Sequence, residues 1–261
     1  MIELTRRNVL SGGAWALAGA GLSLSACGRG AAKTGLTKVT VLGTSHSKHR
    51  TSKRYSLDIL REAVRRAQPD VILSEIPPDR IAEAKRSFAE TGAVTEPRTK
   101  VFPEYTDVIF PLSKDMPFEI IGTAGWTREI ADNRRDALKA IENDPARADQ
   151  WAEHLAAYQT YSRELAGRGD DPLFIHTEEF DQIVERAQTP YQKYFDADLG
   201  AGGWTQINAA HTDLIEAELD TISGQGLNAL VTFGSWHKYM IKRALSPRDD
   251  VELLDPKRLF A

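Results

Sequence analysis

Short apolar runs that end at glycine or at a polar residue alternate along the chain with amphipathic stretches. The β-branched run 39–42 ends at Gly43, and residues 55–67 then place apolar side chains at helical spacing. The run 71–73 follows Pro69 and Asp70 and is apolar throughout, as expected for a strand buried on both faces. This order of strand, helix and strand predicts a parallel, right-handed βαβ unit.

The same alternation continues to the end of the chain. It predicts a helix over 80–91, a strand over 118–121, two helices within 127–168 that separate near Asn143, a helix over 204–222, a strand over 227–233, a helix from Lys238 and a strand over 251–254. We therefore expect an α/β fold with a central, mostly parallel sheet flanked by helices. The sequence predicts a single domain over 37–261, in which a helical insertion at about 127–200 caps the sheet.

The N-terminus has the three parts of an export signal. Arg6 and Arg7 precede a weakly apolar stretch over 12–24, which is too short to span a bilayer, and residues 24–27 read Leu-Ser-Ala-Cys. The paired arginines favour the twin-arginine (Tat) route, and the last four residues resemble a bacterial lipobox. We expect a periplasm-facing lipoprotein of the cell envelope, anchored in the membrane by a lipid on Cys27 and tethered by residues 28–36. The alternatives are an uncleaved membrane anchor or a tail with a chance arginine pair.

Composition narrows the chemistry further. Cys27 is the only cysteine, so the chain after the signal has no thiol for a disulfide, a cysteine zinc site or a cysteine nucleophile. The formal net charge is −4, whereas nucleic-acid binders usually carry a strong basic bias, so no nucleic-acid partner is expected.

Two Gly-x-x-His motifs follow predicted strands. His46 ends the motif that begins at Gly43, His237 ends the motif that begins at Gly234, and Glu75 follows the run 71–73. Open parallel sheets bind ligands outside the carboxyl ends of their strands. Two imidazoles and one carboxylate suit Zn, Mn, Co or Fe(II) and leave positions open for water. The alternative is structural, with each histidine bonded to a loop and Glu75 capping the next helix.

A resemblance to a known family rests on these motifs. The segments 41–46, 69–75 with Arg80, and 234–237 resemble, in order, the TraB/GumN/Tiki superfamily, which in its broad sense includes the erythromycin esterases and the ChaN haem-binding lipoproteins. In the Tiki branch the resemblance implies a metal-dependent protease. The short motifs identify the superfamily better than the branch.

The family also carries polar residues on the helix before the second motif. Here Asn208 and His211 share one face of the helix predicted over 204–222, where they could orient a substrate or support the site. Ile207 stands where relatives often have arginine. Arg80 is interpreted as an ion-pair partner of Glu75 or as an anion clamp, and Trp126 as a pocket wall or a core residue.

Two functions remain open from the sequence. The first is a metal-dependent hydrolase of protease or esterase type, in which His46, Glu75 and His237 hold the metal or Glu75 acts as the general base, His211 assists catalysis, and the substrate is a peptide or a small ester or amide. The second is a lipoprotein that binds haem or another ligand without turnover, because a histidine can ligate haem iron. A site that is structural only is the third possibility.

Overall fold

The computed structural model describes residues 35–261, so the export signal predicted at 1–27 and most of the tether lie outside the described residues. The described residues, 35–261, belong to one compact unit. In the described range, no helix is both long and apolar enough to cross a membrane. Export, lipidation of Cys27 and membrane anchoring therefore stay predictions.

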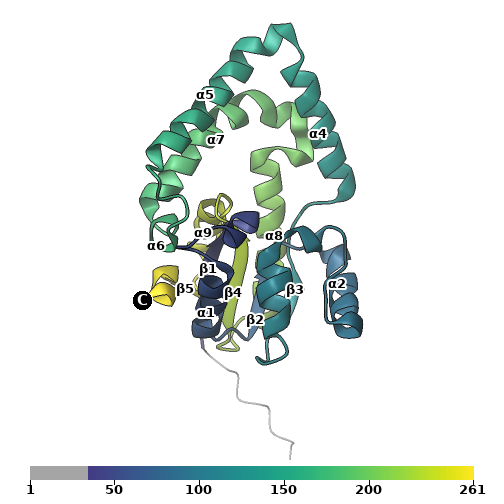
Figure 1. The fold of residues 1–261 in the computed structure, drawn as a ribbon, viewed down its shortest axis with the longest axis vertical. Helices are drawn as coiled ribbons and strands as arrows, with labels where there is room; N and C mark the ends of the chain where they lie inside the picture. Colours follow the sequence, from purple (N-terminus) through teal and green to yellow (C-terminus); the bar gives the residue numbers. More distant parts are fainter. Residues whose placement is uncertain (1–34) are drawn as a thin grey trace, which may run out of the picture. The chain divides into compact units, whose positions relative to one another are not determined.

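A five-stranded sheet forms the centre of the fold (Figure 1). Every strand pair is parallel and the strand order is β3-β2-β4-β1-β5. The strands are β1 (Thr37–Thr44), β2 (Val71–Ser74), β3 (Glu119–Gly122), β4 (Asn228–Gly234) and β5 (Val251–Leu254). The predicted α/β class is confirmed.

The register brings three strand ends together. Thr44 at the end of β1 lies opposite Gly234 at the end of β4, and Ser74 at the end of β2 lies opposite Thr232. Because β4 lies between β1 and β2, the segments that follow these three strands leave the same edge of the sheet side by side.

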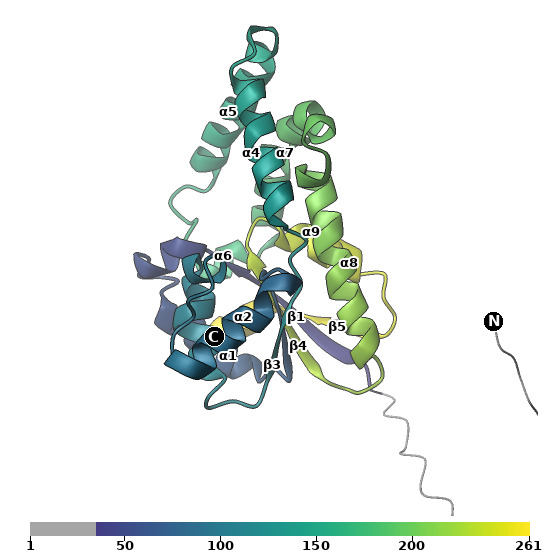
Figure 2. The same ribbon diagram turned by 90° about the vertical axis from the view of Figure 1, so that its right-hand side faces the viewer.

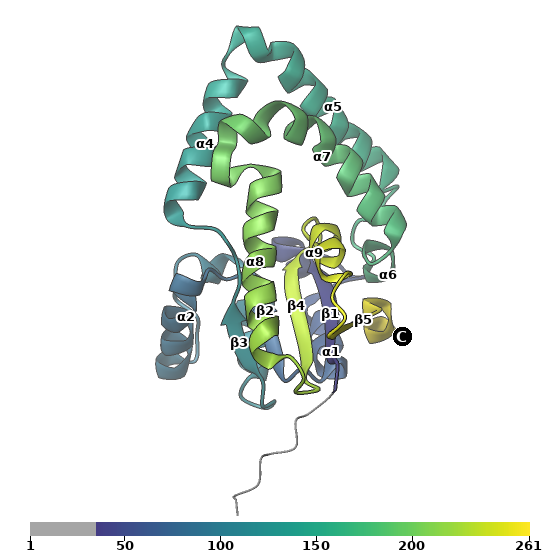
Figure 3. The same cartoon turned by 180° about the vertical axis from the view of Figure 1, so that it is seen from behind.

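Alternating side chains of β1 explain why both faces of the sheet are covered. Val39 and Val41 pack in a core with Ile215 of α8 (Trp204–Ile222) and Ile241 of α9 (Lys238–Leu245). Leu42 points to the other face and packs in a core that includes three buried residues of α1 (Leu57–Ala67) and two of α2 (Pro78–Thr91). Figures 2 and 3 show these helices on opposite sides of the sheet. Side-chain period two thus explains the two-sided burial of the strands.

The middle of the chain forms the predicted helical cap. It contains α4 (Arg128–Glu142), α5 (Ala148–Glu164), the short α6 (Pro172–Ile175) and α7 (Glu178–Leu199). The hydroxyls of Thr127 and Thr177 accept hydrogen bonds from backbone N–H groups three residues on and so begin α4 and α7. Ile141 of α4 packs with buried residues of α7, which gives the cap an apolar core of its own.

The segment between α2 and β3 carried no assignment from the sequence. It contains a 3₁₀ turn at Thr99–Val101, a π-helical stretch at Glu104–Ile109 and the short α3 (Phe110–Leu112). Glu104 and Tyr105 at its start are fully buried. Both side chains reach the strand ends described below.

Candidate functional site

The site lies where the chain changes direction in the sheet. The connection from β1 runs through α1 on one face to β2, and the connection from β4 runs through α9 on the opposite face to β5. Because β1 and β4 are neighbours, their outgoing segments diverge and leave a crevice between them. Such a switch point is the usual ligand site of an open parallel sheet. Both Gly-x-x-His motifs begin there.

Glycine lets the two motifs approach each other closely. A Cβ atom at Gly234 would lie 2.6 Å from Nε2 of His46 and 3.4 Å from Oε2 of Glu75. A Cβ atom at Gly43 would lie 3.0 Å from Cα of Ser235. Non-glycine residues at these two positions would therefore push apart the side chains that face each other across the strand ends.

His46 is held from behind by a buried carboxylate. Its Nδ1 atom donates to Oε1 of Glu104 at 2.5 Å, and the same oxygen accepts from the hydroxyl of Thr44 at 3.0 Å. Burial opposes protonation of His46, but the hydrogen bond to Glu104 and the charges of Glu75 and Glu104 outweigh it and raise the pKa of His46 to about 9. His46 also has a φ angle of 48°, a backbone conformation that non-glycine residues rarely adopt.

His237 is held in the same way by a neutral amide. Its Nδ1 atom donates to Oδ1 of Asn208 at 2.8 Å, and the amide nitrogen of Asn208 donates to the carbonyl of Trp204 at 2.8 Å, which fixes the orientation of the amide. The indole of Trp204 stacks on the imidazole with centroids 4.8 Å apart. Burial lowers the pKa of His237 to about 3, so the ring is neutral and Nε2 carries a lone pair.

Glu75 lies between the two imidazoles. Its Oε2 atom is 3.8 Å from Nε2 of His46, and its Oε1 atom is 3.9 Å from Nε2 of His237. Oε2 accepts a hydrogen bond of 2.6 Å from the backbone N–H of Gly234 at the end of β4. This strand lies between β1, which precedes His46, and β2, which precedes Glu75. The backbone N–H of Glu75 donates to the hydroxyl of Tyr105 at 2.7 Å. The side chain of Glu75 is only 7% exposed, so the surrounding structure fixes its orientation.

The donor set can be compared with a metal site. Two atoms that each bind one ion at about 2.1 Å are at most about 4.2 Å apart, and about 3.4 Å apart in tetrahedral geometry. The distances of 3.8 and 3.9 Å between Glu75 and the two histidines lie between these limits. Within residues 35–261, however, no three His, Cys, Asp or Glu side chains are grouped closely enough to form an assembled ion site. The residue types and the two distances from Glu75 fit a metal.

The contact between Glu75 and His237 is the strongest sign that a cation belongs here. A neutral His237 with its proton on Nδ1 presents a lone pair at Nε2, and Oε1 of Glu75 is also an acceptor. Two acceptors that face each other without a donor between them repel. A positive ion between them removes this repulsion, and the Nδ1 partners Glu104 and Asn208 are the outer hydrogen-bond acceptors that metal-binding histidines usually have.

A cavity of about 200 Å³ opens in front of the two histidines. Its walls come from both motifs, from Lys48 after β1 and from the cap, which contributes Tyr161 and Gly169. Trp236 packs against Tyr161 with ring centroids 4.6 Å apart and donates from Nε1 to the tyrosine hydroxyl at 2.9 Å. The volume is below the roughly 300–1,000 Å³ of pockets that enclose drug-sized ligands, so it holds a small group or one end of a longer molecule.

His211, which the sequence placed among the catalytic residues, is fully buried behind His237. Its Nδ1 atom accepts from the backbone N–H of Gly125 at 2.8 Å, and its ring packs edge-on against His237 at 5.0 Å. Burial, with a smaller effect of the Arg98 charge, lowers the pKa of His211 to about 3. The structure therefore places His211 as support for His237 rather than in the cavity wall.

Two other predicted residues, Arg80 and Trp126, lie away from the cavity, and so does His176, which is not among the predicted site residues. Arg80 pairs with Asp79 at 3.1 Å rather than with Glu75, because it is on the half-exposed side of α2. Trp126 follows β3 and contacts His211, with centroids 6.3 Å apart, but does not line the cavity. His176 accepts from the backbone N–H of Gly43 at 2.9 Å and is a buried structural residue.

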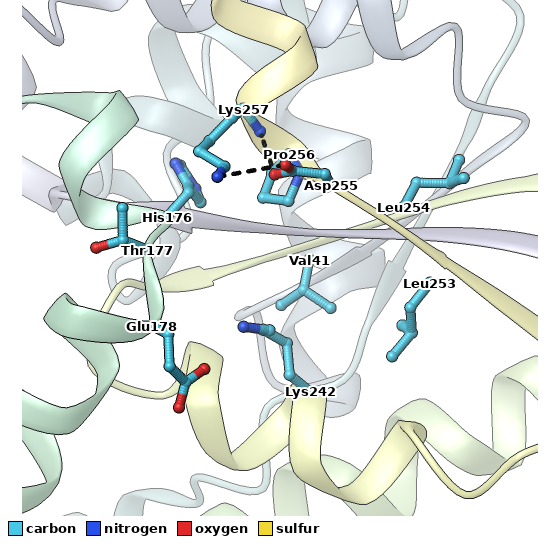
Figure 4. A pocket seen from close by; sticks show the side chains of 10 residues that line it. All are labelled: Val41, His176, Thr177, Glu178, Lys242, Leu253, Leu254, Asp255, Pro256 and Lys257. Carbon is cyan, nitrogen blue, oxygen red and sulfur yellow. Dashed lines mark hydrogen bonds and ion pairs between the residues drawn. The ribbon is translucent and has the colours of Figure 1, made fainter.

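A larger cavity, about 370 Å³, lies along β5 and is lined by His176, Lys242 and Asp255 among others (Figure 4). Both ring nitrogens of His176 are bonded to the backbone, and Asp255 is paired with Lys257. The other side chains that line this larger cavity include the apolar Val41, Leu253 and Leu254. The smaller cavity has the free imidazole nitrogens, so we place the chemistry there despite its size.

Sequence reasoning missed Glu104. The residue lies 58 positions from His46, at the start of a π-helical stretch after Pro103, and a glutamate after proline is typical of any helix start. No local pattern marks it as a partner of the first motif. Only the folded structure places Glu104 beside His46, where its hydrogen bond raises the pKa of the imidazole.

These features define an α/β protein of the open parallel class with a histidine and glutamate site at its switch point. No protein-family profile, curated protein or solved structure matches the chain. The resemblance to the TraB/GumN/Tiki superfamily therefore stays a prediction that rests on the motifs.

Proposed function

We propose that the protein is a hydrolase of ester or amide bonds, with a divalent transition metal held by His46, Glu75 and His237. The observation that carries this proposal is the convergence of two imidazole Nε2 atoms on the two oxygens of one glutamate. Both histidines are oriented from behind, by Glu104 and by Asn208, so that Nε2 is the free atom in each case.

Glu75 is the residue proposed to move the proton. Its Oε2 atom is fixed by the N–H of Gly234, whereas its Oε1 atom accepts no hydrogen bond within residues 35–261. Oε1 is thus available either to bind the metal together with His237 or, where the two histidines alone hold the metal, to take a proton from the attacking water. Tyr161 and Trp236 line the cavity, where their rings would contact the substrate and exclude bulk water.

A divalent metal at this position would supply Lewis acidity, which polarises a carbonyl group and makes water a stronger acid. His46 can bind it only after losing the proton that its raised pKa of about 9 retains. We therefore expect metal affinity to increase with pH up to about 9. His237 is already neutral and imposes no such requirement.

The alternative of haem binding without turnover has less support. Haem needs a broad apolar face beside one histidine, whereas both Nε2 atoms here lie within 4 Å of a carboxylate oxygen, and the cavity that the two histidines line has a volume of about 200 Å³. The proposed location, the periplasmic side of a bacterial envelope membrane, rests on residues 1–27 alone.

Metal content and hydrolysis test the proposal together. The chain from residue 28 onward contains the whole compact unit and is the material to use. We would measure bound metals by elemental analysis, a Soret band by absorbance, and the hydrolysis of 4-nitrophenyl acetate and of a casein digest. The variants are His46→Ala and His237→Ala, and the control is His154→Gln, a buried histidine of the cap whose ring packs against Trp151, Tyr158 and Tyr191.

The expected result is about one equivalent of transition metal and measurable hydrolysis, both lost in the two site variants and kept in the control. Hydrolysis that persists after chelation but is lost in His46→Ala would show that the reaction needs no metal and that the His46–Glu104 pair is the base. A Soret band without hydrolysis would favour haem binding. No hydrolysis of any ester or peptide by metal-loaded protein would reject the hydrolase.

A further inference from the structure

Three cations near the site have no carboxylate partner within residues 35–261. They are Lys48, Arg98 and Arg134, none of which forms an ion pair with a described residue. By contrast, Arg50 pairs with Asp107 at 3.2 Å and Arg54 with Asp170 at 3.9 Å, although both lie with Lys48 in the basic segment 48–54. The arginines of this segment are therefore neutralised, and of its two lysines Lys48 is the one that lines the cavity.

Lys48 is part of the cavity wall itself. It lies in the 3₁₀ turn His46–Arg50 and lines the cavity with His46, His237, Tyr161 and Trp236. A ligand in this cavity thus meets an ammonium group at one side and two aromatic faces at another. This wall suits a negatively charged, partly planar group.

Arg98 and Arg134 form a second positive cluster around Trp126. The guanidinium carbons lie 6.0 and 5.8 Å from the centroid of the indole, within the range of cation–π contact. Nε of Arg98 is buried and has no hydrogen-bond partner in the described chain, and Nε of Arg134 donates to the neutral hydroxyl of Tyr191. Two arginines beside one ring repel each other, and neither has an anion to balance it.

This cluster adjoins the reactive histidines through a row of aromatic rings. Trp126 contacts His211, with centroids 6.3 Å apart, and His211 contacts His237, with centroids 5.0 Å apart. Trp126 is half-buried, so one part of it faces the histidines and another faces solvent. The cluster is therefore separated from His237 by one ring, that of His211, and lies outside the small cavity.

The positively charged residues around the site contrast with the negative net charge of the whole chain. The whole chain has a formal net charge of −4, yet the two carboxylates at the site, Glu75 and Glu104, are buried, whereas Lys48 is exposed. An approaching molecule consequently meets the cations first. Such a local field concentrates anions at a site and speeds their association.

We infer that the protein acts on anionic substrates, whose negatively charged oxygen groups are bound by Lys48 at the cavity wall and, outside the cavity, by Arg98 and Arg134 at the Trp126 cluster. The cleavage of anionic substrates rests on the proposed hydrolase function, whereas the binding of the anion does not. Guanidinium groups bind carboxylates and phosphates through paired hydrogen bonds, so the shared chemistry is an anionic oxygen group.

A charge-matched pair of esters tests the specificity. 4-Nitrophenyl acetate is neutral, and the mono-4-nitrophenyl ester of glutaric acid adds one carboxylate to the same leaving group. The measured quantity is the ratio of kcat/KM for the anionic ester to kcat/KM for the neutral ester. We expect a ratio of about ten or more in the unmodified protein, reduced about tenfold in Arg98→Ala and in Lys48→Ala, because each removes a charge-assisted contact. Arg98→Lys should retain part of the preference.

The matched control is Arg65→Ala. Arg65 is exposed, lies in the last turn of α1 and forms no ion pair within the described residues, and α1 ends at the opposite edge of the sheet from the site. A ratio near one in the unmodified protein, or an equal loss in Arg65→Ala and Arg98→Ala, would overturn the inference while leaving the hydrolase intact.

Calorimetric titration with glutarate and with inorganic phosphate supplies a readout that needs no turnover. Binding of at least one of them, weakened by Arg98→Ala and kept in Arg65→Ala, supports the anion site even if neither ester is cleaved, and comparison of the two anions tells carboxylate from phosphate. Absence of binding of both anions, together with equal cleavage of both esters, would refute the inference.

Discussion

The two Gly-x-x-His motifs share a sequence pattern and differ in charge. Each follows a parallel strand, and each histidine donates from Nδ1 to an oxygen and turns Nε2 towards Glu75. The partner oxygen belongs to the carboxylate of Glu104 in the first motif and to the amide of Asn208 in the second. His46 accordingly has a pKa raised to about 9, and His237 one lowered to about 3.

Burial alone does not explain this difference. The side chain of His46 is 35% exposed and that of His237 is 13% exposed, and desolvation is the largest influence on both, lowering each pKa. Only His46 has a charged hydrogen-bond partner that overcomes it. The motif therefore sets the position of the imidazole, and a residue distant in sequence sets its protonation.

The largest effect is expected from Gly234→Ala, which breaks the arrangement that both motifs share. The new methyl group would lie 2.6 Å from Nε2 of His46, so either His46 or the end of β4 must move. Because displacements of about an ångström cost catalysis about a hundredfold, we expect at least that loss in kcat/KM. Ester hydrolysis and thermal melting measure it, with Ser246→Ala, an exposed serine that follows α9, as the control. Near-normal hydrolysis would show that the two imidazoles need not be close.

Glu104→Gln is expected to have the next largest effect, because it removes the charge that distinguishes the two motifs. In metal-free protein the pKa of His46 should fall from about 9 by roughly two units or more, since burial continues to lower it. A pH titration followed by NMR at the His46 ring measures this shift. Glu96→Gln alters another buried glutamate, one bonded only within its own turn, and is the control.

The same variant alters the dependence of stability on pH. A histidine whose pKa is raised in the folded state contributes stability that is complete below its unfolded pKa of about 6.5 and lost as the pH rises through about 9. His237, with a lowered pKa, has the opposite sign and loses stability as the pH falls from about 6.5 towards 3. Denaturant unfolding between pH 6 and 10 should show the alkaline loss in the unmodified protein and a smaller loss in Glu104→Gln.

How much of this could be read from the sequence depends on the range of the interactions. Apolar runs and glycines mark strands locally, so the strand Val251–Leu254 was predicted with its observed bounds and Glu75 was placed at the end of β2. Asn208 was singled out through the family resemblance, which implies polar residues on the helix before the second motif. Glu104 was not, because its role depends on a contact across 58 residues and on an irregular π-helical stretch that has no regular period. The ion pair expected between Arg80 and Glu75 failed because a nearer carboxylate, Asp79, was available.

Asn208→Asp should make the second motif resemble the first. A carboxylate at this position accepts the same Nδ1–H and adds a charge, so the pKa of His237 in metal-free protein should rise by about one to two units. We expect a smaller change than in Glu104→Gln because His237 is the more buried ring. NMR titration measures the shift, and Asn143→Asp, at the exposed end of α4, is the control. An unchanged pKa would mean that burial, and not the partner, governs His237.

Trp204→Phe is expected to have the smallest effect. It keeps an aromatic ring on His237 and removes the hydrogen bond of 3.0 Å from the indole to the hydroxyl of Tyr239, which contributes about 1 kcal/mol. Thermal melting should fall by about 2–4 °C, and hydrolysis should change less than about threefold. Tyr239→Phe removes the same bond from the other side, so the two variants should lower the melting temperature equally and the double variant no further.

A large loss of hydrolysis in Trp204→Phe with little loss in Tyr239→Phe would instead make the stacked indole the group that orients His237. We expect the opposite because His46 has a comparable aromatic neighbour, Phe102, with ring centroids 4.9 Å apart. An aromatic contact common to both imidazoles cannot cause their opposite protonation. That difference follows from the atom that accepts the Nδ1 hydrogen bond.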